Sequence, residues 1–120
     1  PEAVNDRCAK SHEHIFLFSK KNSYYFDAEA IAEETRRRTD VWTLNTSSFG
    51  GAHFAVFPQQ IPERCIKAGS REGDTVLDPF MGSGTTAYVA QRLSRKWVGV
   101  ELNPKYAQII KDRVAQRELF

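Results

Sequence analysis

The chain has 120 residues, which is enough for at most one domain. Hydrophobic residues make up 41% and aromatic residues 12% of it, so it can fill one core and is not a disordered polar chain. Seventeen basic and fifteen acidic residues give a net charge of +2, which neither requires nor excludes a polyanionic partner. No apolar run approaches the ~20 residues of a membrane span, and the polar N-terminal stretch lacks a signal-peptide pattern. We therefore expect a cytoplasmic protein with no membrane partner.

The first forty residues predict a hairpin followed by a helix. The apolar run IFLF at 15–18 indicates a buried strand, and YYFD at 24–27 indicates a second, so residues 12–27 are expected to form a strand pair. The helix formers of AEAIAEETRRR predict a short helix over 28–38. Its end carries Arg36, Arg37 and Arg38, which either contact DNA phosphates or form a solvated helix end.

Residues 41–57 show no period, and the remainder is regular. Residues 58–68 have helical propensity, with Pro58 expected at the first helical position and Gly69 as the stop. Strands are predicted at 75–80 and 96–102, and helices at 85–93 and 103–117. Links this short predict an α/β fold with a parallel sheet. The last helix is expected to bury an apolar stripe, and Trp97 is expected in the core; the stripe comprises Tyr106, Ile109, Ile110 and Val114.

The turn between the first of these strands and its helix has a ligand-binding pattern. The run GSGTTA at 82–87 fits G-x-G-x-x-G/A, and Glu101 follows at the end of the next strand. Glycines permit a tight turn and a close approach by a ligand, and an acid at that strand end can accept hydrogen bonds from ribose hydroxyls. The alternative is a turn that serves architecture alone.

The residues around the turn favour one cofactor over others. No lysine follows the last glycine, so the phosphate-loop pattern fails. The strand ends in Asp78-Pro79-Phe80. A carboxylate there would repel a pyrophosphate and would suit the ammonium group of a methionine moiety. This favours S-adenosylmethionine (SAM), and a nicotinamide-dependent oxidoreductase fragment remains an alternative.

DPFMGSGTT followed by WVGVELNPKY resembles the cofactor-binding half of the amino-methylating DNA methyltransferases, in the group whose catalytic motif precedes the cofactor motifs. DVWTLNTSSFGGAHFAVFP and KSHEHIFLFSKKNSYYFD are also similar to segments of that family. The resemblance implies one domain over 1–120 with a partial Rossmann-like sheet. Residues 12–27 would be the strand pair that ends the catalytic half, and residues 41–120 would be the SAM-binding half.

The resemblance also implies a role for individual residues. Asp78 would face the methionine end of the cofactor, and Glu101 would hold the ribose hydroxyls. The remaining residues would line the ligand or contact its carboxylate: Phe57 and Pro58 at the methionine pocket, Phe80 beside the ligand, Gly82, Ser83 and Gly84 along it, and Thr85 and Thr86 as caps of the following helix.

Two departures from the family stand out. Its catalytic tetrapeptide, an Asp or Ser followed by Pro-Pro and an aromatic residue, is absent, since no two prolines are adjacent. Only residues 28–40 stand where a target-recognition region is usual. We therefore expect no catalytic residue in this chain. It would be a fragment, a degenerate product or one part of a split restriction-modification enzyme. A second polypeptide would supply the catalytic motif, or the chain would form a homodimer.

The parent activity implied by the resemblance is transfer of a methyl group to the exocyclic amine of adenine or cytosine in DNA, on a base flipped out of the duplex. The alternative is a non-catalytic module that binds SAM or a partner chain. Cys8, His12 and His14 lack a fourth ligand at helpful spacing, so no metal site is expected.

Overall fold

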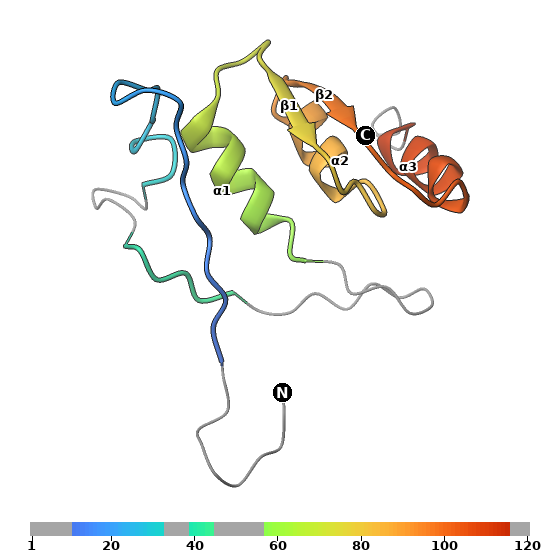
Figure 1. Ribbon diagram of the computed structural model, residues 1–120, viewed down its shortest axis with the longest axis horizontal. Helices are drawn as coiled ribbons and strands as arrows, with labels where there is room; N and C mark the ends of the chain where they lie inside the picture. The colour runs from blue at the N-terminus through green and yellow to red at the C-terminus, as the bar shows by residue number, and fades with distance from the viewer. Residues whose placement is uncertain (1–10, 33–38, 45–56, 116–120) are drawn as a thin grey trace, which may run out of the picture.

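The computed structural model describes residues 11–32, 39–44 and 57–115. Five elements occur in these ranges, in the order α1 (Gln60–Gly69), β1 (Thr75–Asp78), α2 (Thr85–Arg92), β2 (Lys96–Gly99) and α3 (Lys105–Ala115) (Figure 1). The predicted order of helices and strands after residue 57 is confirmed, and the chain is a partial α/β fold. None of the helices in the described ranges is long and apolar enough to cross a membrane.

The two strands form a parallel pair, as predicted. Val76 lies opposite Trp97 and Leu77 opposite Val98. The backbone pairing continues beyond the strands, because the Val100 amide donates to the Asp78 carbonyl at 3.0 Å and the Met81 amide donates to the Val100 carbonyl at 2.9 Å. The chain that leaves β1 is therefore held against the chain that leaves β2 at the carboxyl end of the sheet.

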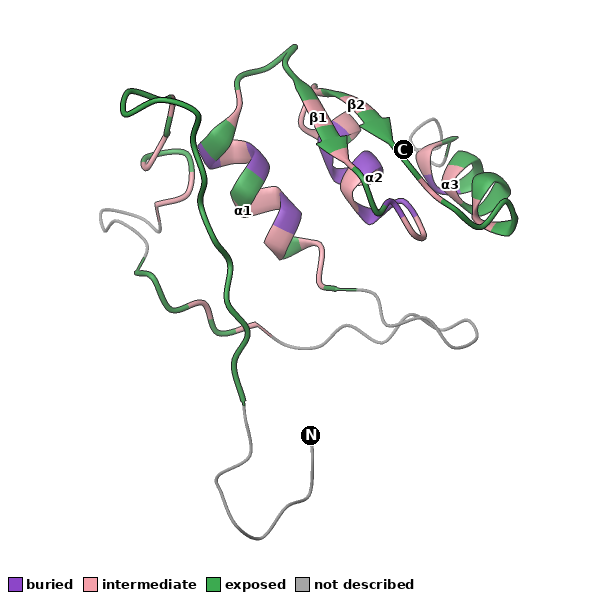
Figure 2. Ribbon diagram, in the orientation of Figure 1, coloured by how far each residue is buried: buried purple, intermediate pink, exposed green. Residues whose placement is uncertain are grey.

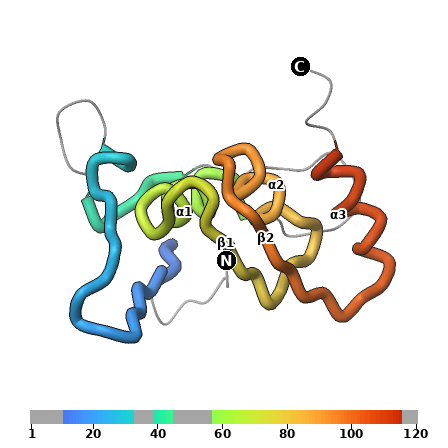
Figure 3. Tube along the Cα trace, turned by 90° about the horizontal axis from the view of Figure 1, so that it is seen from above, coloured from blue at the N-terminus to red at the C-terminus, as the bar shows by residue number. Residues whose placement is uncertain are grey.

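Helix α2 covers one face of this sheet and lies between α1 and α3 (Figures 1 and 3). Alternation along the strands turns Val76 and Trp97 toward the core. The buried centre joins α1 to α2 through Ile66, Val89 and Ala90 (Figure 2). Trp97 thus packs against the core, as the sequence predicts.

The part of the chain that the structure describes leaves the opposite face of the sheet uncovered. Leu77 is 64% exposed and its register partner Val98 is 51% exposed. Strands that are apolar on both faces are typical of parallel sheets covered on both sides. Within the described residues, only one face has such a cover.

The start of α1 differs from the expectation. Pro58 precedes the helix, and Gln59 occupies the N-cap position. Pro62 is the third helical residue and is buried. A proline in the first turn removes an amide that has no intrahelical acceptor, so Pro62 fits there without breaking the helix. The predicted stop is confirmed, since α1 ends at Gly69.

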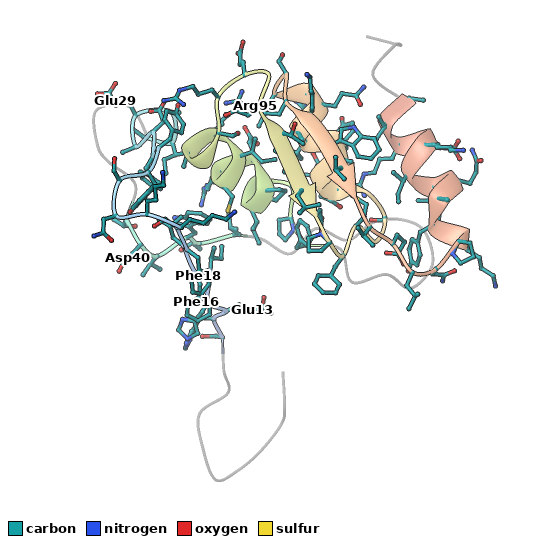
Figure 4. The ribbon with its side chains drawn as sticks, turned by 45° about the horizontal axis from the view of Figure 1, so that its top comes forward. Glu13, Phe16, Phe18, Glu29, Asp40 and Arg95 are labelled. Carbon is teal, nitrogen blue, oxygen red and sulfur yellow. The ribbon has the colours of Figure 1, made fainter. Side chains whose placement is uncertain are left out.

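The predicted buried strand pair over 12–27 does not form. Residues 11–27 contain no paired strand, and Phe18 is 87% exposed. Figure 4 shows Phe16 and Phe18 on this segment, apart from β1 and β2. An isolated strand is not stable without neighbours that pair with it and cover it, and the described residues provide neither. The segment is joined to α1 near its end, where the Asp27 amide donates to the Ala68 carbonyl at 2.8 Å.

The helix predicted over 28–38 lies partly outside the described residues, which here stop at 32. Residues 30 and 31 form a turn. The Asp27 carboxylate accepts a hydrogen bond from the Ala30 amide at 2.9 Å, which closes this turn. Arg36, Arg37 and Arg38 lie outside the described residues, and their contact with DNA stays a prediction.

Candidate functional site

The site is built on the turn that joins β1 to α2. Gly82 has φ = 52° and Gly84 has φ = 81°, in the left-handed region that side chains disfavour. The Gly84 amide donates to the Met81 carbonyl at 2.9 Å, which closes the turn. We call residues 81–84 the glycine loop. The two glycines are needed for its backbone path.

The helix cap differs from the prediction. Gly84 is the N-cap of α2, and no side chain forms a cap hydrogen bond. Thr85 is the first helical residue and is only 3% exposed. Thr85 and Thr86 therefore do not cap α2. A glycine with left-handed φ brings the chain into the helix one residue earlier than a threonine cap would.

Glu101 contacts the glycine loop directly, across 19 residues of sequence. One carboxylate oxygen, Oε2, accepts the Gly82 amide at 2.8 Å, and the other, Oε1, accepts the Asn103 amide at 2.8 Å. A carboxylate has about four acceptor positions, so these two bonds leave capacity for hydroxyl donors. The sequence predicts that Glu101 and the loop share a site, and the structure brings them together.

Asp78 and Phe80 lie where β1 leaves the sheet. The Asp78 Oδ1 accepts the Phe80 amide at 2.9 Å, which holds the chain in a tight turn after the strand. Asp78 is half-buried, and Phe80 is 87% exposed. An aromatic ring this exposed is available to a flat ligand. Phe57 and Pro58 lie immediately before α1, and their part in a methionine pocket stays a prediction.

Helix α3 holds the loop from the other side, through a residue that the sequence reasoning missed. Arg113 is 8% exposed, and its Nη1 donates to Ser83 Oγ at 3.0 Å and to the Ser83 carbonyl at 3.4 Å. Desolvation lowers the pKa of Arg113 from its ordinary value. An arginine keeps its charge even so.

The predicted buried stripe on α3 is therefore wrong in part. Arg113 is its buried residue, whereas Ile109 is 40% exposed and Tyr106, Ile110 and Val114 are only half-buried. Positions 106, 110 and 113 lie on one face of a helix. The helical spacing could have identified Arg113, but the predicted stripe consists of apolar residues alone and does not include it.

The glycine loop also packs closely against β2 through Met81. Met81 is 4% exposed and lies against Gly99 of β2. A Cβ added at Gly99 would overlap the Met81 Cε and lie 3.0 Å from its Cγ. Since β2 leads to Glu101, the packing of Met81 on Gly99 helps to bring the loop and the carboxylate into register.

The basic residues at the other end of the strands have a structural explanation. A hollow of about 480 Å³ lies there, beside the C-terminal ends of α1 and α2. Arg95 donates to the Leu93 carbonyl at 2.6 Å and to the Ser70 carbonyl at 2.7 Å, so it satisfies carbonyls at both helix ends. Cations are favoured near helix C-termini for this reason. The other basic residues that line this hollow are Lys67, Arg71 and Arg92.

The structure offers no support for a metal site in the ranges it describes. No group of three or more His, Cys, Asp or Glu side chains is gathered within those ranges. The His12 and His14 rings lie edge to face, with centroids 5.1 Å apart. Cys8 lies outside the described residues.

Comparison with known proteins gives a consistent set of relatives. A family model described as DNA methylase matches residues 1–112. The chain is 49% identical to the type II methyltransferase M.SmaI of Serratia marcescens, over 98% of this chain and 42% of that protein. It is 48% identical to the type II methyltransferase M.Cfr9I of Citrobacter freundii, over 95% of this chain and 40% of that protein. The chain thus spans about two-fifths of the length of these relatives.

Solved structures agree with the sequence relatives. The PvuII DNA methyltransferase, which is cytosine-N4-specific, superposes with a TM-score of 0.68 at 28% identity, over 80% of this chain and 38% of that chain. M1.HpyAVI in complex with SAM gives a TM-score of 0.64 at 28% identity, over 79% of this chain and 45% of that chain. Together with the family match, these findings show a partial fold of the SAM-dependent methyltransferase type. The chain belongs to the DNA methylase family of the N6/N4 type.

Proposed function

We propose that residues 41–120 form the SAM-binding half of a DNA methyltransferase that methylates the exocyclic amine of adenine or cytosine. The observation that carries this proposal is the contact between the Glu101 carboxylate and the Gly82 amide at 2.8 Å. It brings an acceptor for ribose hydroxyls onto a glycine loop at the carboxyl end of two parallel strands, which is where open sheets of this kind bind ligands.

The residues of the site fit this cofactor. Glu101 retains acceptor capacity for two hydroxyls, and Asp78 supplies a carboxylate for an ammonium group. Phe80 presents an exposed ring beside the loop. Bound SAM would supply the methyl group. The residues named here would bind and orient it, and Phe57, Pro58, Thr85 and Thr86 would complete the pocket.

We propose further that this chain does not methylate DNA by itself. The sequence contains no Pro-Pro pair, so it lacks the tetrapeptide that would accept hydrogen bonds from the target amine. The exposed pair Leu77 and Val98 supports a missing structural partner, because a parallel sheet is stable when both faces are covered. The catalytic motif and the DNA-reading surface would come from outside this sequence, for example from a second polypeptide. A second copy of the chain lacks the same motif, so a homodimer would contribute only cover for the uncovered face of the sheet.

The test begins with binding. The chain is titrated with SAM by calorimetry, with a nicotinamide dinucleotide as the control ligand and Asp78→Ala and Glu101→Ala as control variants. Binding of SAM alone, weakened in both variants, is the expected result. Binding of the nicotinamide dinucleotide instead would favour the oxidoreductase alternative. Binding of neither ligand would mean that the loop is architectural.

Transfer of a labelled methyl group to DNA is then measured with the chain alone and with a polypeptide that carries the catalytic half of a relative. Activity only in the mixture is expected, and digestion to nucleosides identifies N4-methylcytosine or N6-methyladenine. Activity of the chain alone would refute the need for a second part. Tight SAM binding without activity in the mixture would favour a non-catalytic module.

A further inference from the structure

The glycine loop is restrained by side chains from two different elements. Glu101, after β2, holds the Gly82 amide, and Arg113, near the end of α3, holds Ser83. Arg113 contacts both the hydroxyl and the carbonyl of Ser83, so it restrains the backbone as well as the side chain. Arg113 and Ser83 are 30 residues apart in sequence, so this contact makes α3 part of the site.

Burial of Arg113 calls for a reason. An arginine is rarely buried unless it is paired, because removing its charge from water is costly. Arg113 is 8% exposed, and the centre of its guanidinium lies 5.8 Å from the centroid of the Tyr88 ring. An apolar residue at this position would continue the apolar face of α3 at lower cost. The fold instead retains a side chain whose donors reach Ser83.

Ser83 needs such an anchor. It lies between two glycines with left-handed φ, and glycine loses more conformational freedom on folding than any other residue. A loop that lines a ligand with its backbone gains affinity when that backbone is already in the bound geometry. A charged donor that bonds twice to the central residue of the loop supplies this preorganisation.

We propose that Arg113 is a positioning residue for cofactor binding: it holds Ser83 so that the glycine loop is preformed for the ligand. This inference rests on the proposed function of the loop. Hydrogen bonds to a charged group contribute more than neutral ones, so we expect removal of the guanidinium to weaken SAM binding about tenfold.

The chain contains a matched control. Arg92 also lies by the Tyr88 ring, at 5.6 Å from its centroid, but it is exposed and belongs to α2. Arg92→Met and Arg113→Met remove the same chemical group beside the same ring. Only the second removes the contact with Ser83.

The first measurement does not need the cofactor. Amide hydrogen exchange of residues 82–84 is compared in the unliganded chain, below the melting temperature of every variant. We expect Arg113→Met to accelerate exchange in the loop, with Arg113→Lys intermediate and Arg92→Met unchanged. Unchanged loop exchange in a folded Arg113→Met variant would overturn the proposal, even if the chain binds no SAM.

The second measurement is a double-mutant cycle on the dissociation constant for SAM. Ser83→Ala and Arg113→Lys are conservative and keep the cycle usable if Arg113→Met does not fold. We expect each single variant to weaken binding and the double variant to be no weaker than the worse single one. Additive effects would overturn the proposal, because a merely structural role of Arg113 would not depend on the Ser83 hydroxyl. Failure of the unmutated chain to bind SAM would instead refute the proposed function and leave the exchange result to decide the role of Arg113.

Discussion

Replacing Gly84 by alanine places a methyl group at the point where α3 crosses the glycine loop. Gly84 has φ = 81°, and a Cβ there would lie 3.2 Å from the Ile110 Cγ1 and 3.4 Å from the Ile110 Cα. The left-handed conformation costs about 1–2 kcal/mol for a residue with a side chain. Crowding against α3 adds about 1–3 kcal/mol, as overpacking usually does. We expect Gly84→Ala to lower the free energy of unfolding by about 2–5 kcal/mol.

Gly73 provides the matched comparison. Its φ is 83°, close to that of Gly84, and an added Cβ would meet nothing within 4 Å. Gly73→Ala should therefore lose only the conformational part, about 1–2 kcal/mol. The difference between the two variants isolates the close approach of α3 to the loop.

The assay is urea denaturation followed by circular dichroism. Ile110→Ala is added to Gly84→Ala to remove the two γ-carbons that crowd the new methyl group. We expect the double variant to be more stable than the sum of the single effects predicts. Equal losses for Gly73→Ala and Gly84→Ala would refute the reasoning, since they would show that α3 does not press on the loop.

Three further predictions concern other parts of the chain. Gly99→Ala should lower the melting temperature because its Cβ would overlap Met81. Gly69→Ala is the control in the same thermal melt, since a Cβ there would meet nothing within 4 Å. Equal melting temperatures of the two variants would contradict the packing of Met81 on Gly99. Glu101→Gln keeps the shape of the side chain but removes its charge, so SAM binding should weaken about tenfold, as for the loss of a charge-assisted hydrogen bond. An unchanged dissociation constant for SAM in calorimetry would exclude Glu101 from the ribose site. Replacing Arg36, Arg37 and Arg38 by alanine should weaken DNA binding by the chain mixed with its catalytic partner, and should reduce the dependence of the DNA affinity on salt concentration. An unchanged salt dependence in a binding titration would favour a solvated helix end instead.

Much of the second half could be predicted from local patterns. The strand TVLD, the glycines of the loop and the helix that follows carry their own signals, because turn chemistry and periodicity act over a few residues. The pairing of Glu101 with the loop followed from a general rule about parallel sheets, in which the carboxyl ends of neighbouring strands meet at one edge.

The prediction of a buried strand pair in the first half of the chain was wrong for a physical reason. The run IFLF has the composition of a buried strand, yet Phe18 is 87% exposed and no strand forms. A strand is stabilised by neighbouring strands and by elements that cover it, and these are often distant in sequence. An apolar run therefore indicates that a segment could be a buried strand, but not that its partners are present. The exposed Leu77 and Val98 on the sheet likewise lack a covering element among the described residues.

By itself, the sequence determined the family, the order of elements after residue 57 and the place of the glycine loop, because each depends on neighbouring residues. Only the tertiary structure decided what restrains that loop. Ile110 packs close to Gly84, Met81 packs against Gly99, and a buried arginine thirty residues away donates hydrogen bonds to Ser83. Contacts of this kind depend on how α3 and β2 fold back over the loop, and side-chain packing between distant segments leaves no local pattern to detect.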